Sequence, residues 1–284
     1  KVKGDVNAQK YWWIYQRVRK EMYDAISFNK NIIVLAQTAK YILPTFTTND
    51  KVHSVKVIVF TDESSTQFAL LANSLYNEWC WKFGTTMGSS TLQYSTSQCF
   101  DSYPFPQKLI LKLESIGEVY HDHRKQLMLG MQLGLTKTYN LFHSNAITAQ
   151  STNDKDKQVA SLQKHLDKTV NTISFDEAIQ GILTLRELHV QMDEAVLDAY
   201  GWNDIALKHD FYDVDYLPEN DRVRFTIHPD ARKEVLKRLL ELNHKIHEEE
   251  KESGLLDKKK TVSKKSNVVN EPQAGYGGNL FNQE

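Results

Sequence analysis

The stretch from Phe68 to Pro106 constrains the fold more than any other part of the sequence. Apolar or aromatic residues recur through its first half, at Phe68, Leu71, Leu75, Trp79 and Phe83. This spacing predicts one continuous helix with a single apolar face, and Gly84 stands where its C-cap is expected. A polar run with almost no formal charge follows and ends at Tyr103-Pro-Phe-Pro106, because each proline fixes its own φ and disfavours helix in the residue before it. A helix, an uncharged loop and a stiff exit are typical of a scaffold that presents side chains to a partner.

The remaining N-terminal residues predict one helix and two or three strands. Residues 10–28 are expected to form a helix whose start is rich in Tyr and Trp. Residues 31–40 and 52–60 predict strands, because both are rich in β-branched residues and a turn-prone TTND segment lies between them. Residues 41–47 are a candidate for a third short strand.

From residue 107 onward, long periodic apolar stripes predict helices. Ser174 and Glu177 form a predicted capping box ahead of one of them, and residues 183–200 continue its apolar face. His228-Pro229 opens another helix, expected over residues 230–250, because proline is well accommodated in the first turn.

The sequence therefore predicts an α+β fold in which a small mixed α/β recognition unit packs on a mostly helical unit. The expected boundaries are 1–106 for the α/β unit, 107–252 for the helical unit and 253–284 for a flexible tail, because the last segment is rich in Lys, Ser, Asn and Gly. No apolar run approaches 18 residues and no signal-peptide pattern opens the chain, so a cytoplasmic location is expected. Cys80 and Cys99 are expected to be reduced core thiols. The chain begins with Lys1 rather than Met, which favours a piece of a longer protein.

Residues 68–106 resemble the target-recognition region of large single-chain adenine DNA methyltransferases, the type IIG and related restriction–modification proteins. In that family a strand pair, an "FALL…W…G" helix, a variable loop and an "FPFP"-like exit follow one another. Further matches occur in the family's order at GLTKTYNLFH (134–143), LRELH (185–189) with Met192-Asp193, AYGW (199–202) and ARKEVLKRLLELNH (231–244). The resemblance covers nearly the whole chain and implies recognition of double-stranded DNA for an N6-adenine methyltransferase of a restriction–modification or phage-defence system.

The catalytic elements of such an enzyme are missing from this sequence. Methyl transfer needs a Gly-rich cofactor loop beside a strand and an Asn/Asp-Pro-Pro-Tyr/Phe element for the flipped adenine. None of the 6 prolines is followed by another, and Gly275-Tyr-Gly-Gly278 lies in the predicted tail. A Mg²⁺-dependent nuclease needs a Glu-x-Lys pattern on a strand, whereas Glu249-Glu-Lys251 lies in a predicted helix. We expect no catalytic, cofactor or metal residues in this chain, and an upstream methyltransferase domain of the same protein that uses S-adenosylmethionine.

The predicted DNA contacts are polar side chains at the end of the strand predicted over residues 31–40 and in the uncharged loop. Gln37 suits bidentate contact with adenine, Thr38 suits methyl or hydroxyl contacts, and Lys40 suits guanine or phosphate. The resemblance implies that the loop lies in the major groove, with contacts from Ser89, Ser90, Thr91, Gln93 and Tyr94. The family usually has more Arg and Lys in this loop, so its composition here favours A·T-rich or water-mediated readout. The net charge of −1 fits a module that reads bases while another domain holds the phosphates.

Other residue patterns have plainer interpretations. His121 and His123 lie on different sides of a helix and cannot chelate one metal ion, so a solvated pair is expected. His189 and Asp193 predict a helix-surface contact. The tryptophans could stack on bases but are expected in the core; they are Trp12, Trp13, Trp79 and Trp81.

Two partner hypotheses remain besides DNA. Leu280 and Phe281 weakly resemble motifs that dock on replication sliding clamps. The alternative to DNA recognition as a whole is a helical module that docks on another protein subunit without direct base contacts.

Overall fold

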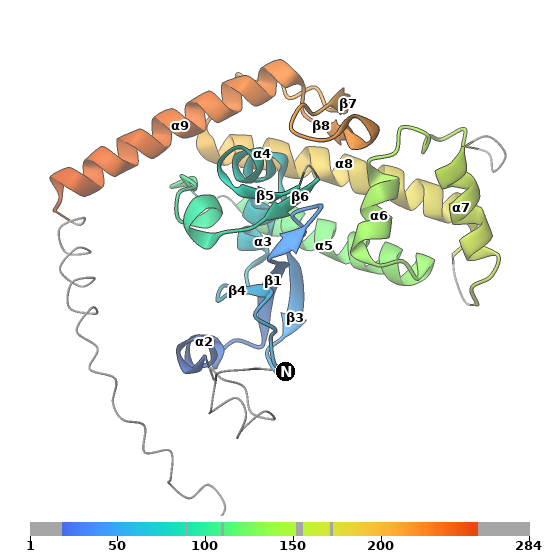
Figure 1. Cartoon of the computed structure of the whole chain (residues 1–284), viewed down its shortest axis with the longest axis horizontal. Helices are drawn as coiled ribbons and strands as arrows, with labels where there is room; N and C mark the ends of the chain where they lie inside the picture. Colours follow the sequence, from blue (N-terminus) through green and yellow to red (C-terminus); the bar gives the residue numbers. More distant parts are fainter. Residues whose placement is uncertain (1–18, 89, 109–110, 152–155, 171–172, 255–284) are drawn as a thin grey trace, which may run out of the picture. The chain divides into compact units, whose positions relative to one another are not determined.

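The computed structural model describes residues 19–88, 90–108, 111–151, 156–170 and 173–254 (Figure 1). The chain divides into two compact units, Lys1–Lys237 and Arg238–Glu284. The predicted division after residue 106 lies inside the first unit. Residues 10–18 of the helix predicted over 10–28, and residues 255–284 of the predicted tail, lie outside the described residues, and the rest of that helix forms only α2, over Lys20–Ile26.

The described elements mix helices with short antiparallel strands, which confirms the predicted α+β class. The helices are α2 (Lys20–Ile26), α3 (Ser65–Ala72), α4 (Ser74–Phe83), α5 (Leu111–Met131), α6 (Leu135–Phe142), α7 (Lys157–Leu166), α8 (Phe175–Tyr200) and α9 (Pro229–Glu252), with a π-turn η1 (Thr96–Phe100) and a 3-10 turn η2 (Glu219–Asp221). The strands are β1 (Asn31–Ala36), β2 (Thr38–Ala39), β3 (Thr45–Thr48), β4 (Val57–Phe60), β5 (Thr85–Met87), β6 (Thr91–Gln93), β7 (Asp210–Asp213) and β8 (Val223–Thr226). They form the sheets β3-β1-β4, β2-β6-β5 and β7-β8. Over the described ranges, none of the helices has the length and apolar character needed to cross a bilayer.

The first sheet corrects two predicted strand lengths. The strand predicted over 52–60 is formed only by β4, and Val52 and Val55 are exposed in the segment before it. The strand predicted over 31–40 is interrupted at Gln37, whose N–H donates to the carbonyl of Lys56 and whose carbonyl accepts from the N–H of Tyr94. Gln37 therefore joins the first sheet to the second. The residues before it form β1 of the first sheet, and the residues after it form β2 of the second.

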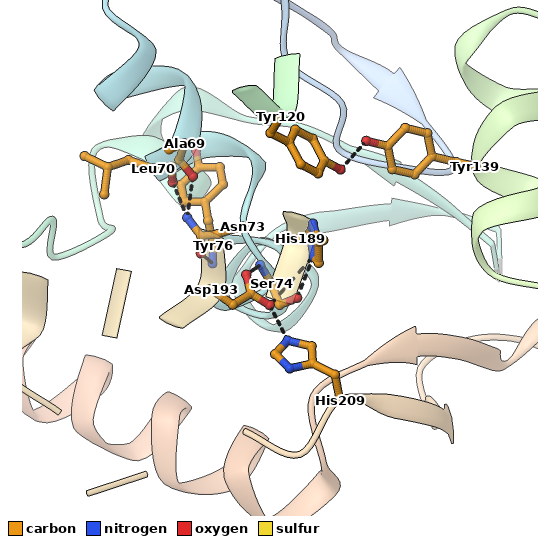
Figure 2. Close-up of polar contacts among 10 residues, drawn as sticks. All are labelled: Ala69, Leu70, Asn73, Ser74, Tyr76, Tyr120, Tyr139, His189, Asp193 and His209. Carbon is orange, nitrogen blue, oxygen red and sulfur yellow. Dashed lines mark hydrogen bonds and ion pairs between the residues drawn. The ribbon is translucent and has the colours of Figure 1, made fainter. Parts of the chain in front are cut away.

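The prediction of one continuous helix over 68–83 is wrong, because the helix breaks at Asn73. The Asn73 side chain donates to the carbonyls of Ala69 and Leu70 at the end of α3, at 2.9 and 2.8 Å (Figure 2). Its Oδ1 accepts from the N–H of Tyr76 and caps the start of α4. One buried amide thus satisfies backbone groups of both helices, and the apolar face continues across the break.

Gly84 caps α4 as predicted, but its backbone is extended, with φ −77 and ψ 172. The glycine is needed for space rather than for a left-handed turn, because a Cβ atom here would lie 2.4 Å from the carbonyl oxygen of Cys80. Cys80 and Cys99 are both buried and free, as the sequence predicts.

Helices α5 and α8 lie side by side and α3 packs on α5 (Figure 1). Ser174 and Glu177 form the predicted capping box at the start of α8. Pro229 is the first residue of α9, as predicted. Glu114 of α5 accepts hydrogen bonds from the backbone N–H groups of Ser65 and Thr66 at the start of α3. These contacts cross the predicted 106/107 boundary, which explains why both sides of it belong to one compact unit.

We expect Gly117→Ala to lower the free energy of unfolding by about 1–3 kcal/mol. A Cβ atom at Gly117 would lie 2.1 Å from the backbone oxygen of Ser65, so α3 and α5 must separate. The control is Gly181→Ala in α8, where the new atom meets the flexible end of Leu127 at 2.4 Å. Urea unfolding of both variants tests this, and equal stability of the two would contradict a rigid α3–α5 contact.

Candidate nucleic-acid interface

The small sheet β2-β6-β5 brings together two polar segments that are far apart in the sequence. Gln93 of β6 is paired with Thr38 of β2 on one side and with Thr85 of β5 on the other. Directly paired residues share a face of a sheet, so these three side chains form one row, and all three are exposed. The neighbouring position, Leu92, faces the opposite side and is buried. The row through Gln93 is therefore polar and exposed, whereas Leu92 anchors the opposite side of β6 in the core.

A shallow depression of about 410 Å³ lies beside this row. It is lined by uncharged residues, among them Gln37, Thr85, Gln93, Ser97 and Gln98. The hydroxyl of Thr85 donates to Oε1 of Gln98 at 3.1 Å. The depression therefore offers amide and hydroxyl groups that can both donate and accept, as base edges do, and no cations.

Five of the predicted contact residues lie in or next to this sheet. Thr38 and Gln93 are exposed, while Gln37, Ser90 and Thr91 are half-buried. Gly88, with φ +67, begins the turn between β5 and β6. Ser89 lies outside the described residues, so its role stays a prediction.

Lys40 and Tyr94, also predicted to contact DNA, are engaged within the protein. Lys40 pairs with Asp221 at 2.8 Å and stands over the ring of Tyr41. Tyr94 is only 2% exposed, and its hydroxyl is hydrogen-bonded to that of Tyr76 in the core. Neither position offers its polar group to a base, because Lys40 is held by a carboxylate of its own chain and Tyr94 is covered.

A buried polar network lies at the start of α4 (Figure 2). The N–H of Ser74 donates to Oδ1 of Asp193 at 2.7 Å, and Nε2 of His209 lies 2.7 Å from Oδ2 of the same carboxylate. The hydroxyl of Ser74 lies 2.9 Å from Nε2 of His189. His189 and Asp193 are 8% and 0% exposed, so the predicted helix-surface contact is wrong. Their partners lie on α4 and just before β7, and helical spacing on α8 carries no sign of them.

The charges in this network are set by burial and by neighbours. Burial lowers the pKa of His189, although Asp193 acts against this shift. Burial alone would raise the pKa of Asp193, but His189, His209 and Ser74 outweigh it, and the pKa lies below its ordinary value. The result is a carboxylate held at a helix N-terminus, where backbone N–H groups and the helix dipole favour negative charge.

The grouping of Ser74, His189 and Asp193 does not have the geometry of a hydrolytic triad. In a triad, the serine and the carboxylate contact different nitrogens of the histidine. Here both lie nearest Nε2 of His189, at 2.9 and 3.7 Å, and its Nδ1 is buried without a hydrogen-bond partner among the described residues. The network therefore serves to connect α4, α8 and the segment before β7.

A second buried acid, Glu78, contacts Arg232 in the first turn of α9. Its carboxylate lies 3.2 Å from Nε of Arg232 and 3.3 Å from the hydroxyl of Tyr216. Burial raises the pKa of Glu78 to about 7, and Arg232 and Tyr216 offset only part of that shift. Glu78 thus changes charge in the neutral range of pH.

The LRELH motif at 185–189 supplies buried structural groups as well. The guanidinium of Arg186 donates to four backbone carbonyls at the end of α6 and just beyond it, those of Leu141, Phe142, Ser144 and Ile147. Burial lowers the pKa of Arg186 to about 10, so the group is still charged at neutral pH. Cations near a helix C-terminus are stabilising, and here one side chain satisfies carbonyls that α6 leaves unpaired.

Two further predictions concern single side chains. Trp79 and Trp81 are buried, as predicted, whereas Trp12 and Trp13 lie outside the described residues. The predicted solvated His pair is wrong: His121 packs edge-on against Phe46, and Nε2 of His123 contacts the carbonyl of Gly181 at 2.8 Å. In the described ranges, no group of three or more His, Cys, Asp or Glu side chains is placed to hold a metal ion.

No family model matches the chain, and no curated protein matches it. Among solved structures, the chain is similar to the type IIL restriction-modification enzyme MmeI, whose structure was determined in complex with DNA. The TM-score is 0.42 and the identity 14%, over 78% of this chain and 22% of that chain. The chain thus spans less than a quarter of that enzyme's chain, and a likeness of this degree transfers neither residue roles nor activity.

Proposed function

We propose that this chain is the sequence-recognition part of an adenine-specific DNA methyltransferase of the restriction–modification or phage-defence type. It reads double-stranded DNA with the exposed face of the sheet β2-β6-β5. The observation that carries the proposal is the register that sets Thr38, Gln93 and Thr85 in one exposed polar row. The ordered motifs along the sequence supply the enzyme class.

The hairpin of β5 and β6 and the polar side chains of the sheet suit the major groove, which admits a two-stranded β-ribbon. Glutamine amides pair there with adenine N6 and N7. The Gln93 side chain is exposed, and none of the described residues forms a hydrogen bond with its amide. The uncharged lining of the depression fits a module in which phosphate contacts come from elsewhere in the parent protein.

The residues proposed to read bases are revised accordingly. The proposed base-reading residues are Gln37, Thr38, Ser90, Thr91 and Gln93. Lys40 and Tyr94 are left out, because Lys40 is paired with Asp221 and Tyr94 is buried. Methyl transfer with S-adenosylmethionine is assigned to an upstream domain of the parent protein. Contact with a sliding clamp through Leu280 and Phe281 stays a prediction, because both lie outside the described residues.

We expect Gln93→Ala to weaken binding to the preferred duplex by about tenfold, the effect of losing one bidentate base contact. Binding of the chain to duplexes selected from a randomised library, measured by fluorescence anisotropy at low salt, tests this. The control is Gln126→Ala, at an exposed position of α5 that does not line the depression. Selection of no sequence by the native chain would overturn the proposal and favour the protein-docking alternative.

A further inference from the structure

We propose that Gln98 is a further specificity-determining residue, whose amide NH2 group reads an acceptor-rich base edge, that of guanine. This inference rests on the proposed function, because it assigns a role within the same interface. Gln98 lies in the uncharged polar run described in the sequence analysis. Its residue type and its position in that run do not distinguish it from the neighbouring polar residues.

The orientation of the Gln98 amide is fixed by Thr85. The Thr85 hydroxyl donates to Oε1 of Gln98 at 3.1 Å, so the amide oxygen is turned toward β5. A glutamine amide has an acceptor oxygen with two lone pairs and an NH2 group with two donors, so the bond from Thr85 occupies one lone pair and leaves both N–H donors for a partner. A free glutamine such as Gln93 can turn either group outward, which suits adenine, whereas an amide whose oxygen is turned toward its own protein presents its donors, which suits the O6 and N7 acceptors of guanine.

The backbone that carries Gln98 is also held in place. The Gln98 carbonyl accepts from the Ser102 hydroxyl at 2.6 Å, and that hydroxyl in turn accepts from the indole N–H of the buried Trp79 at 3.1 Å. The next residue, Cys99, is 0% exposed and anchors η1 in the core. Gln98 is therefore an exposed side chain on a rigid turn, which is the arrangement that lets one amide discriminate between bases.

The Gln98 side chain also lies where the proposed function needs it. It lines the same uncharged depression as Gln37 and Gln93, and its hydrogen-bond partner Thr85 belongs to the exposed row of the sheet. A duplex that lies on this row therefore meets the Gln98 amide at the edge of the same contact.

The test is selection of preferred duplexes from a randomised library by the native chain and by two variants. Gln98→Glu keeps an acceptor for the Thr85 hydroxyl but replaces the outward donor with an acceptor. We expect one position of the selected motif to change from guanine to cytosine, whose N4 donates, with a preference of about tenfold. Thr85→Val removes the hydroxyl and releases the amide, so the same position should come to accept adenine as well as guanine.

The control is Gln126→Glu, which makes the same change of charge at an exposed position of α5 outside the depression. It should leave the motif unaltered. If the native chain selects a motif and both Gln98→Glu and Thr85→Val keep it, the role of Gln98 is refuted while the proposed function stands. If the native chain selects no motif, the proposed function and the role of Gln98 are both refuted. Gln98 is exposed, so Gln98→Glu remains informative even where Thr85→Val disturbs the sheet.

Discussion

Replacing Arg186 with methionine should lower the free energy of unfolding by about 3–5 kcal/mol, the largest effect we expect in this chain. Methionine keeps the unbranched apolar stem of the side chain and removes the guanidinium, so most of the loss comes from the hydrogen bonds. The native guanidinium satisfies four backbone carbonyls around the end of α6. Methionine leaves them facing an apolar group. Urea unfolding followed by circular dichroism measures the change.

A matched control for Arg186→Met is Glu187→Met on the same helix. Glu187 is exposed, so its replacement should change stability by less than about 0.5 kcal/mol. Hydrogen exchange adds a local readout, because residues 142–147 should lose protection before the rest of α6 in Arg186→Met. Equal stability of the two variants would show that the carbonyls find other partners.

Asp193→Ala should cost about 3 kcal/mol at neutral pH, because it removes one partner of a buried charged network. The variant leaves the N–H of Ser74 and Nε2 of His209 without the acceptor that they share. The control is Asp198→Ala, also on α8, whose exposed pair with Lys112 should contribute less than about 1 kcal/mol. Thermal or urea unfolding of both variants measures the two losses of stability, and equal losses would contradict the prediction.

The cost of Asp193→Ala should also depend on pH. The folded-state pKa of Asp193 lies below its ordinary value of 3.8, so the ionised carboxylate is favoured by folding. Such a group stabilises the protein fully above its unfolded pKa, and the contribution is lost as the pH falls through the folded pKa. The difference between the native chain and Asp193→Ala should therefore be full at pH 7 and shrink in strong acid. A difference that grows on acidification would contradict this account.

The elements that can be predicted from the sequence are those whose signals are local. The capping box at Ser174, the helix start at Pro229 and the strand at 31–36 all depend on residues a few positions apart. The break at Asn73 was missed because an unbroken apolar stripe hides it, although Asn followed by Ser is a common start of a helix. The strand at 52–60 was overextended because β-branched composition measures a preference for extended backbone, whereas pairing with a neighbour decides which residues form a strand.

The site was only partly predictable, and for a related reason. The run of uncharged polar residues is visible in the sequence, but nothing local shows that Thr38 and Thr85 flank Gln93. The internal contacts of Lys40 and Tyr94 are not predictable from the sequence, because their partners, Asp221 and Tyr76, are remote in it. Conversely, His189 and Asp193 look like surface residues on a helical wheel, and only tertiary packing brings Ser74 and His209 to them.

Because of Glu78, folding of this protein changes the number of protons that the chain binds. Its pKa rises from 4.5 to about 7 on folding, so at pH values between the two the folded state binds a proton that the unfolded state releases. Folding is therefore coupled to proton uptake at this carboxyl, and this contribution to stability falls as the pH rises from 4.5 toward 7. At this one position, the proton therefore acts as a ligand that binds the folded state more tightly than the unfolded state.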